Sequence, residues 1–144
     1  MFKIIVFFFL IWKNKNFNEK FDGIVYAVFI SLGFAAVENI MYVVKHGVPT
    51  GIIRAFTAVP AHALFGVCMG YFLGEAKFSQ NRKGMLLSFI VPVALHGFYD
   101  FIIMSQNNWL LLLFKPFMIF MLFLGLKRMK QHSDSSVFKD NSQA

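Results

Sequence analysis

Residues 88–104, SFIVPVALHGFYDFIIM, form the stretch that decides the fold: an apolar run with His96 at its middle and Asp100 one helical turn later. A second apolar run, residues 55–70 (AFTAVPAHALFGVCMG), carries His62 in the same way. A charged side chain that faces lipid at the centre of a membrane helix costs roughly 2.5–3.5 kcal/mol. We therefore expect these ionisable side chains to face one another inside a helix bundle.

The composition places the chain among polytopic membrane proteins. Hydrophobic residues make up 58% of the 144 positions and charged residues only 15%, whereas about a quarter of a soluble domain is charged. The net charge of +7 does not indicate nucleic-acid binding, because the basic residues lie between and after apolar runs and no nucleic-acid-binding module accompanies them. Cys68 is the single cysteine, which excludes an intrachain disulfide and a multi-cysteine metal site.

The predicted fold is all-α, a polytopic membrane helix bundle with four full transmembrane helices preceded by a shortened apolar helix. A span needs about 20 residues to cross a hydrocarbon core of about 30 Å. The opening stretch, MFKIIVFFFLIW, is too short for that, and KNKN follows it without a signal-peptide cleavage site. The four segments of sufficient length are residues 23–44, 51–74, 84–104 and 109–126.

The loop charges alternate and predict the orientation of the chain in the cytoplasmic membrane. Basic residues cluster in residues 13–22, in residues 75–83 and after residue 126, and the positive-inside rule puts these segments in the cytoplasm. Residues 46–50 and 105–108 then face outward. Residues 127–144 are predicted to be a disordered cytoplasmic tail, because the end of the chain is polar and low in apolar content.

Helical rise places four ionisable residues at compatible depths in the outer half of the bilayer. Glu38 lies about 9 Å below the outer edge, His62 about 16 Å, His96 about 12 Å and Asp100 about half as deep as His96. His96 and Asp100 are i,i+4 neighbours, so the carboxylate is placed to orient the ring. Arg54 lies near the outer end of its helix, where it is expected to snorkel without a chemical role.

The backbone around the two histidines has features that favour close packing and broken helices. Pro60 and Pro92 each remove a helical hydrogen bond just before a histidine. His62 also begins a row of residues spaced by four, which continues with Gly66, Gly70 and Gly74. These overlapping GxxxG patterns predict that a neighbouring helix lies close to this face.

Carboxylates and imidazoles in a partly dry cavity can activate water. A carboxylate can accept a proton or hold a metal, and a histidine can donate to a developing oxyanion. Two histidines and a carboxylate are also a known zinc ligand set, so a divalent metal such as zinc is a candidate cofactor. HExxH and GxSxG patterns are absent from the sequence. A proton or ion path uses the same residue types and is a further alternative.

Three motifs in this order, FDGIVYAVFISLGFAAVENIMY, RAFTAVPAHALFGVCMGYFLG and LHGFYDF, resemble those of the PrsW family of bacterial intramembrane proteases. That family is related to the CAAX-prenyl endopeptidase and bacteriocin-processing membrane proteases. The resemblance covers about residues 3–126. It implies a membrane-embedded protease-like domain over residues 1–126, with cleavage of membrane-anchored protein substrates near the outer face, as in site-1 cleavage of an anti-sigma factor.

The resemblance also implies roles for the four ionisable residues. Glu38 matches the Glu of an ENILY-like motif, His62 the His of HALFG, and His96 and Asp100 those of HGxYD. The expected catalytic set is thus Glu38, His62, His96 and Asp100: the two histidines bind the catalytic water, the oxyanion or a metal, Asp100 orients His96, and Glu38 supports the cavity electrostatically. Family members are catalogued as metallopeptidases, while their relatives favour a glutamate-activated water, and the sequence leaves both open.

The chain departs from the family pattern at its first residues. The family carries a Glu-Glu-x-x-Lys motif, and Lys3 falls at its Lys, so that the two glutamates would occupy the positions before Met1. Together with the short first apolar helix, this predicts an N-terminally incomplete version of a longer protein. The alternative functions are a catalytically inactive or substrate-binding remnant and a small ion or proton carrier.

Overall fold

The computed structural model describes residues 2–80, 82–105 and 107–136, which form six α-helices. In chain order they are α1 (Phe2–Leu10), α2 (Lys20–His46), α3 (Val48–Phe56), α4 (Ala58–Phe78), α5 (Arg82–Met104) and α6 (Asn108–Asp134). Four candidate spans are long and apolar enough to cross a membrane: α2, the α3–α4 unit, α5 and α6. The predicted all-α helix bundle of a membrane protein is therefore confirmed.

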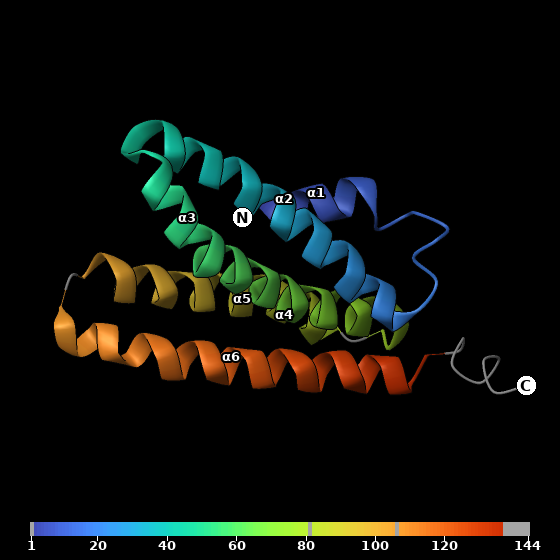
Figure 1. Cartoon of the computed structure of the whole chain (residues 1–144). Helices are drawn as coiled ribbons and strands as arrows, with labels where there is room; N and C mark the ends of the chain where they lie inside the picture. The colour runs from blue at the N-terminus through green and yellow to red at the C-terminus, as the bar shows by residue number, and fades with distance from the viewer. Residues whose placement is uncertain (1, 81, 106, 137–144) are drawn as a thin grey trace, which may run out of the picture.

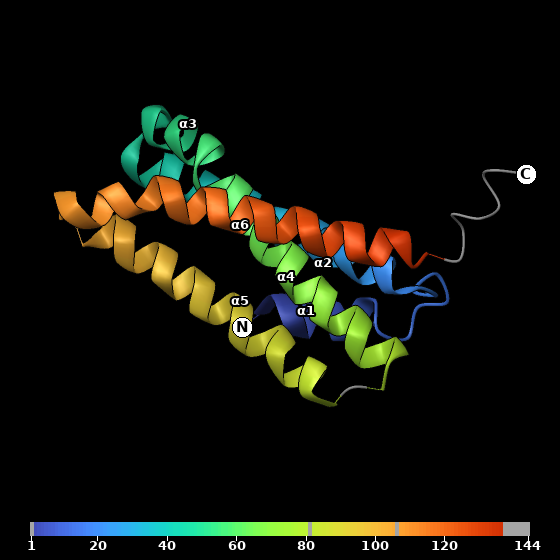
Figure 2. The same cartoon turned by 90° about the horizontal axis from the view of Figure 1, so that it is seen from below.

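The helices form one bundle in which α4 is central (Figure 1). It contacts α2, α3, α5 and α6, and α1 packs against α2. The α1–α2 connection and the end of α6 lie at one end of the bundle, and the α2–α3 and α5–α6 connections lie at the other (Figure 1). Viewed from below, α5 and α6 diverge from each other along much of their length (Figure 2).

The second predicted span consists of two helices instead of one. Helix α3 ends at Phe56, Thr57 caps it, and α4 begins at Ala58. Pro60 has no backbone N–H to offer the carbonyl of Phe56, so the hydrogen-bonded ladder cannot continue across this point. Pro92 also lacks its N–H, but α5 continues through it.

The glycine row of α4 lies directly against α2. A Cβ atom added at Gly66 would come within 2.9 Å of the Cα atom of Val28, and one at Gly74 within 2.5 Å of the carbonyl oxygen of Lys20. At Gly70 it would collide with the backbone of Gly23. The close approach predicted from the GxxxG spacing is thus confirmed, and it brings α4 against residues 20–31 of α2.

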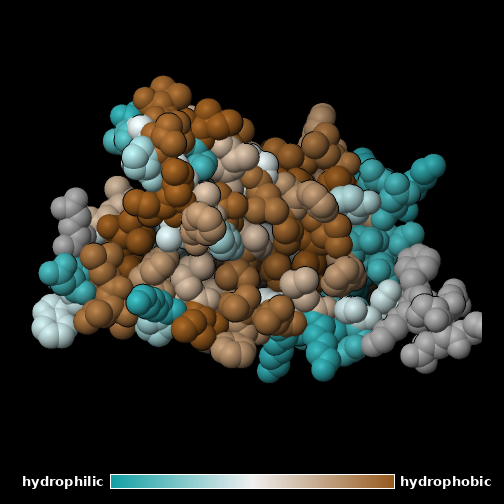
Figure 3. Space-filling view, viewed as in Figure 1, coloured by the Kyte–Doolittle hydropathy of each residue, from teal (hydrophilic) through white to brown (hydrophobic). Residues whose placement is uncertain are grey.

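Apolar side chains cover much of the surface, as expected for a protein whose solvent is lipid. Figure 3 shows hydrophobic residues over the middle of the molecule and hydrophilic residues gathered mainly towards the end where the α1–α2 connection lies. The exposed apolar side chains come from all six helices and include Phe9, Phe29, Ile53, Met104 and Phe123.

Helix α6 extends beyond the expected end of the fourth span. It continues to Asp134, so residues 127–134, assigned to the tail on sequence grounds, are helical. Buried contacts hold this extension, and they stabilise a polar segment that composition alone marks as disordered. Of the remaining tail, residues 137–144 lie outside the described part of the chain.

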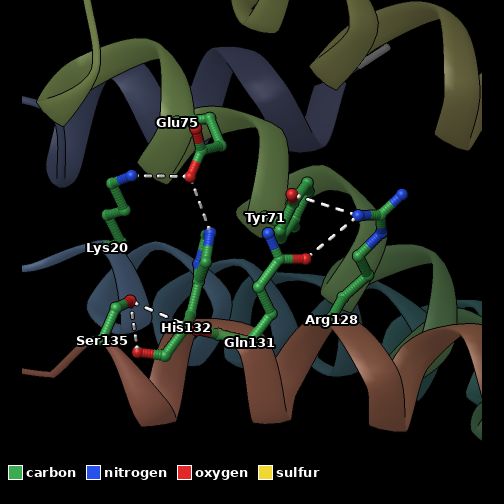
Figure 4. Close-up of polar contacts among 7 residues, drawn as sticks. All are labelled: Lys20, Tyr71, Glu75, Arg128, Gln131, His132 and Ser135. Carbon is green, nitrogen blue, oxygen red and sulfur yellow. Dashed lines mark hydrogen bonds and ion pairs between the residues drawn. The ribbon is translucent and has the colours of Figure 1, made fainter.

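A cluster that we call the α6 clasp joins the end of α6 to α2 and α4 (Figure 4). The carboxylate of Glu75 lies 2.8 Å from Lys20 Nζ and 3.2 Å from His132 Nε2. The ring of His132 is buried and stacks on Tyr71, with centroids 4.4 Å apart. Arg128 Nη1 donates to the Tyr71 hydroxyl at 3.1 Å. Buried polar groups with partners of this kind fix one arrangement of neighbouring helices.

Candidate functional site

The four predicted site residues come together from three helices. Glu38 lies on α2, His62 on α4, and His96 and Asp100 on α5. His62 Nε2 is 3.3 Å from Glu38 Oε2, and His96 Nε2 is 3.3 Å from Asp100 Oδ2. The ring centroids of the two histidines lie 4.9 Å apart. The bundle thus places two carboxylate–imidazole pairs side by side.

The two pairs differ in burial and in access to open space. The side chain of His62 is only 4% exposed, whereas that of His96 is 32% exposed. A cavity of about 370 Å³ lies between α1, α2, α4 and α5, and its polar lining residues are Lys3, Ser31, Ser88, His96 and Asp100. His62 and Glu38 do not line this cavity. His96 and Asp100 are therefore the pair that a molecule in the cavity would meet.

Helix α1 contributes Lys3, which contacts both the cavity and His62. Its ammonium nitrogen lies 3.0 Å from Ser31 Oγ and 3.1 Å from His62 Nδ1. An ammonium group has three N–H donors and no acceptor. It therefore donates to the hydroxyl and to the imidazole, and a third donor is left beside the cavity.

Arg54 is a site residue that sequence reasoning missed. Its Nη2 atom lies 3.2 Å from Glu38 Oε2, and its guanidinium carbon lies 3.7 Å from the centre of the Tyr42 ring. The side chain is 17% exposed, so it does not snorkel away from the bundle as expected. The reason is the break after Phe56, because α3 can then take a direction of its own and direct Arg54 towards α2.

Aromatic packing fixes the ring of His96 from the side of α4. Phe65 stacks on this ring, with centroids 5.4 Å apart and an interplanar angle of 29°. Phe65 is itself buried in the core between α4, α5 and α6, in contact with Tyr99 at 6.1 Å. The imidazole is thus held by a stacked ring on one side and by Asp100 at its Nε2 atom.

Comparison with known proteins identifies the family. Residues 1–126 match the PrsW family, described as intramembrane metalloproteases. The chain belongs to the PrsW family. Relatives in this family include protease PrsW of Oceanobacillus iheyensis, which is 41% identical over 138 residues, and that of Bacillus subtilis, 44% identical over 124 residues. Protease PrsW of Clostridioides difficile is 35% identical over 132 residues. No solved structure matches the chain.

The alignments include most of this chain but only about three fifths of the length of these PrsW relatives. The three alignments include 94%, 84% and 86% of this chain, but 64%, 56% and 56% of the respective relatives. The family resemblance predicted from the three motifs is confirmed. The residues matched to the family description end at residue 126, whereas the alignment that includes 94% of this chain continues into the α6 extension.

The side chains of the described residues are not arranged as a metal site, although the PrsW family is described as a family of metalloproteases. Among them, no group of three or more His, Cys, Asp or Glu side chains is placed to hold a metal. Both ring nitrogens of His62 have partners, and one of these is the cationic amine of Lys3. A second cation at Nδ1 would meet that charge at close range.

Proposed function

We propose that this chain forms an intramembrane peptidase centre that hydrolyses membrane-anchored proteins near the outer face of the bilayer. The observation that carries the proposal is His96, which lines the cavity with one ring nitrogen on Asp100 and a second imidazole 4.9 Å away. Membership in the PrsW family supports the reaction class. The chain spans only 56–64% of the length of the three relatives, so the activity of the whole protease is proposed for this chain.

His96 is the proposed general base. When Asp100 accepts a hydrogen bond from the Nε2–H group, the proton of the neutral ring is on Nε2 and the lone pair is on Nδ1. This nitrogen can take a proton from a water molecule as it attacks a peptide carbonyl and then deliver the proton to the leaving amine. Asp100 acts as a positioning residue, since it fixes both the tautomer and the direction of the ring.

Lys3 is the proposed partner of the developing oxyanion. Two of its N–H donors are used by Ser31 and His62, and the side chain also lines the cavity. A preorganised cation beside a carbonyl stabilises the negative charge that develops on its oxygen, most strongly where water is excluded. Lys3 and His96 border the same cavity from α1 and α5.

His62 and Glu38 are proposed to hold Lys3 in place, which changes the role expected from the sequence. The family resemblance implies that His62 binds the catalytic water, the oxyanion or a metal. Both ring nitrogens of His62 have protein partners. We instead propose that Glu38, supported by Arg54, holds the ring at Nε2, and that the ring in turn holds Lys3 at Nδ1. Glu38 keeps its expected electrostatic role, and Arg54 supports it.

The proposed setting is the cytoplasmic membrane, with the C-terminus in the cytoplasm. The basic segments in residues 13–22 and 75–83 support this orientation. Basic residues also gather at the end of α6, at the end of the bundle that carries the α1–α2 connection (Figure 1). The substrate is proposed to be a membrane-anchored protein that reaches the cavity from the bilayer.

Cleavage of a membrane-anchored reporter tests the proposal. The purified chain is reconstituted in lipid vesicles with the reporter, beside the variants His96→Ala and His46→Ala. His46 is the matched control because it lies at the exposed end of α2. We expect cleavage by the parent chain and by His46→Ala, and its loss in His96→Ala. Proton flux that depends on Glu38, without cleavage, would instead support the carrier alternative.

A further inference from the structure

Ser31 is buried at the point where α1, α2 and α4 meet, and its hydroxyl connects all three. The residue is 0% exposed. Its Oγ atom donates to the carbonyl oxygen of His62 at 2.6 Å and accepts from Lys3 Nζ at 3.0 Å. A serine hydroxyl has a single hydrogen. Because that hydrogen is used on α4, the oxygen can present only lone pairs to Lys3.

The direction of each following hydrogen bond is then determined. The ammonium of Lys3 donates to Ser31 and also to His62 Nδ1, which lies 3.1 Å away. A ring nitrogen that accepts carries no proton, so the hydrogen of neutral His62 is on Nε2. That nitrogen faces Glu38 Oε2 at 3.3 Å, and a carboxylate is an acceptor.

The opposite tautomer of His62 is disfavoured at both nitrogens. Its Nδ1–H group would point at an ammonium, which has no lone pair, and its bare Nε2 would point at a carboxylate. Both contacts would be repulsive in a buried place, where such interactions are poorly screened. Glu38 at Nε2 and Lys3 at Nδ1 therefore set the tautomer of His62 together, and the share due to Lys3 is lost if Lys3 leaves the place where Ser31 holds it.

We propose that Ser31 is a positioning residue of the site, which seats Lys3 against Nδ1 of His62 and so fixes the imidazole as its Nε2–H tautomer. The inference deepens the proposed peptidase function and rests on it, because holding the Lys3 ammonium at the cavity serves catalysis only if the chain is a peptidase. Lysine has a flexible stem. Without the hydroxyl, Lys3 can turn towards Asp100, which lines the same cavity.

The chain offers a matched control in Ser88. This serine is also buried, at 1% exposure, and it lines the same cavity. Its hydroxyl donates to the carbonyl oxygen of Met85 in its own helix at 2.7 Å. Ser31→Ala and Ser88→Ala therefore each remove one buried hydroxyl from the cavity wall, but only Ser31→Ala affects Lys3.

The test is ring-nitrogen NMR of the full chain in lipid bilayers with nitrogen-15-labelled histidine. The nitrogen shifts of a neutral imidazole show which nitrogen carries the proton, and a His62→Gln sample identifies the signals of His62. We expect the Nε2–H form in the parent chain and in Ser88→Ala. In Ser31→Ala we expect the tautomer ratio to move towards Nδ1–H by about tenfold, in line with the loss of a hydrogen bond to a charged group.

Lys3→Met provides a second variant that keeps an apolar stem and removes the donor. It is expected to shift the His62 ratio at least as far as Ser31→Ala does. An unchanged ratio in Ser31→Ala, or an equal change in Ser88→Ala, would overturn the inference. Because the spectrum requires no turnover, a shifted tautomer in a chain without cleavage would support the role of Ser31 while contradicting the proposed peptidase activity.

Discussion

The imidazole rings of His62 and His96 lie 4.9 Å apart, although they belong to different helices and are 34 positions apart in the sequence. Each ring directs its Nε2 atom at a carboxylate 3.3 Å away. His96 borders the cavity, while His62 lies behind it between Lys3 and Glu38. The two similar pairs therefore support different roles, one in proton transfer and one in placing a cation.

Asp100→Asn is expected to reduce cleavage without abolishing it. The amide can present its NH₂ group to Nε2 of His96, which favours the tautomer with the proton on Nδ1 and removes the base from the cavity. We predict a lower kcat with little change in KM, measured with the reconstituted chain and a membrane-anchored reporter. A change confined to KM would contradict the positioning role of Asp100.

Arg54 and Glu38 are expected to act as a unit. Arg54→Ala, Glu38→Ala and the double variant form a cycle in which the separate losses of activity should not add, because the two side chains are in direct contact at 3.2 Å. We predict that the double variant is only slightly worse than Glu38→Ala. Strictly additive losses, measured as kcat/KM, would show that Arg54 acts independently of Glu38.

Gly70→Ala is expected to destabilise the bundle. The new methyl group would meet the backbone of Gly23 and Ile24, so α2 and α4 must move apart, at a cost of about 1–3 kcal/mol. Gly33→Ala is the control, because a Cβ atom there has nothing within 4 Å. It should be neutral or stabilising by up to about 1 kcal/mol. Thermal unfolding in detergent compares the two, and equal Tm values would contradict the packing account.

Glu75→Ala is expected to loosen the end of α6. The change leaves Lys20 and the buried ring of His132 without their shared acceptor, and a buried polar group without a partner costs about 1–3 kcal/mol. Lys127→Ala, at an exposed position, should change stability by less than about 0.5 kcal/mol. Hydrogen exchange along residues 127–134 measures the effect. Unchanged protection in Glu75→Ala would show that the α6 clasp does not hold the helix.

The features that depend on sequence periodicity and spacing were predictable. Apolar length predicted the four spans, the GxxxG row predicted that a neighbouring helix lies close to its face, and the spacing of His96 and Asp100 predicted their pairing. The prolines were a weaker signal, because Pro60 and Pro92 each remove a helical hydrogen bond, yet the helix is broken near Pro60, just before Ala58, and continues through Pro92. The spans, the close helix contact and the His96–Asp100 pair follow from the length of a helix and from the spacing of residues along it, and both can be read from the sequence.

The features that depend on the direction of a helix were not predictable. Arg54 meets Glu38 because α3 leaves the axis of α4, and no spacing in the sequence encodes that angle. His132 and Glu75 are 57 positions apart, and the polar composition around His132 favoured a disordered tail. The contact of Lys3 with His62 likewise requires the position of α1 against α2. Its signals in the sequence were a basic residue within a short apolar helix and the match of Lys3 to the Lys of the Glu-Glu-x-x-Lys motif, and neither signal indicates His62 as the partner.

The most direct test of the central claim is hydrolysis by the purified chain in oxygen-18-labelled water. The chain and a membrane-anchored reporter are reconstituted together, with His96→Ala in parallel, and the reporter products are analysed by mass spectrometry. The account predicts a new C-terminus that contains labelled oxygen, formed with the parent chain and reduced about 10²- to 10⁴-fold in His96→Ala, the range typical of a lost general base. The absence of cleavage by the parent chain, or equal cleavage by His96→Ala, would contradict it.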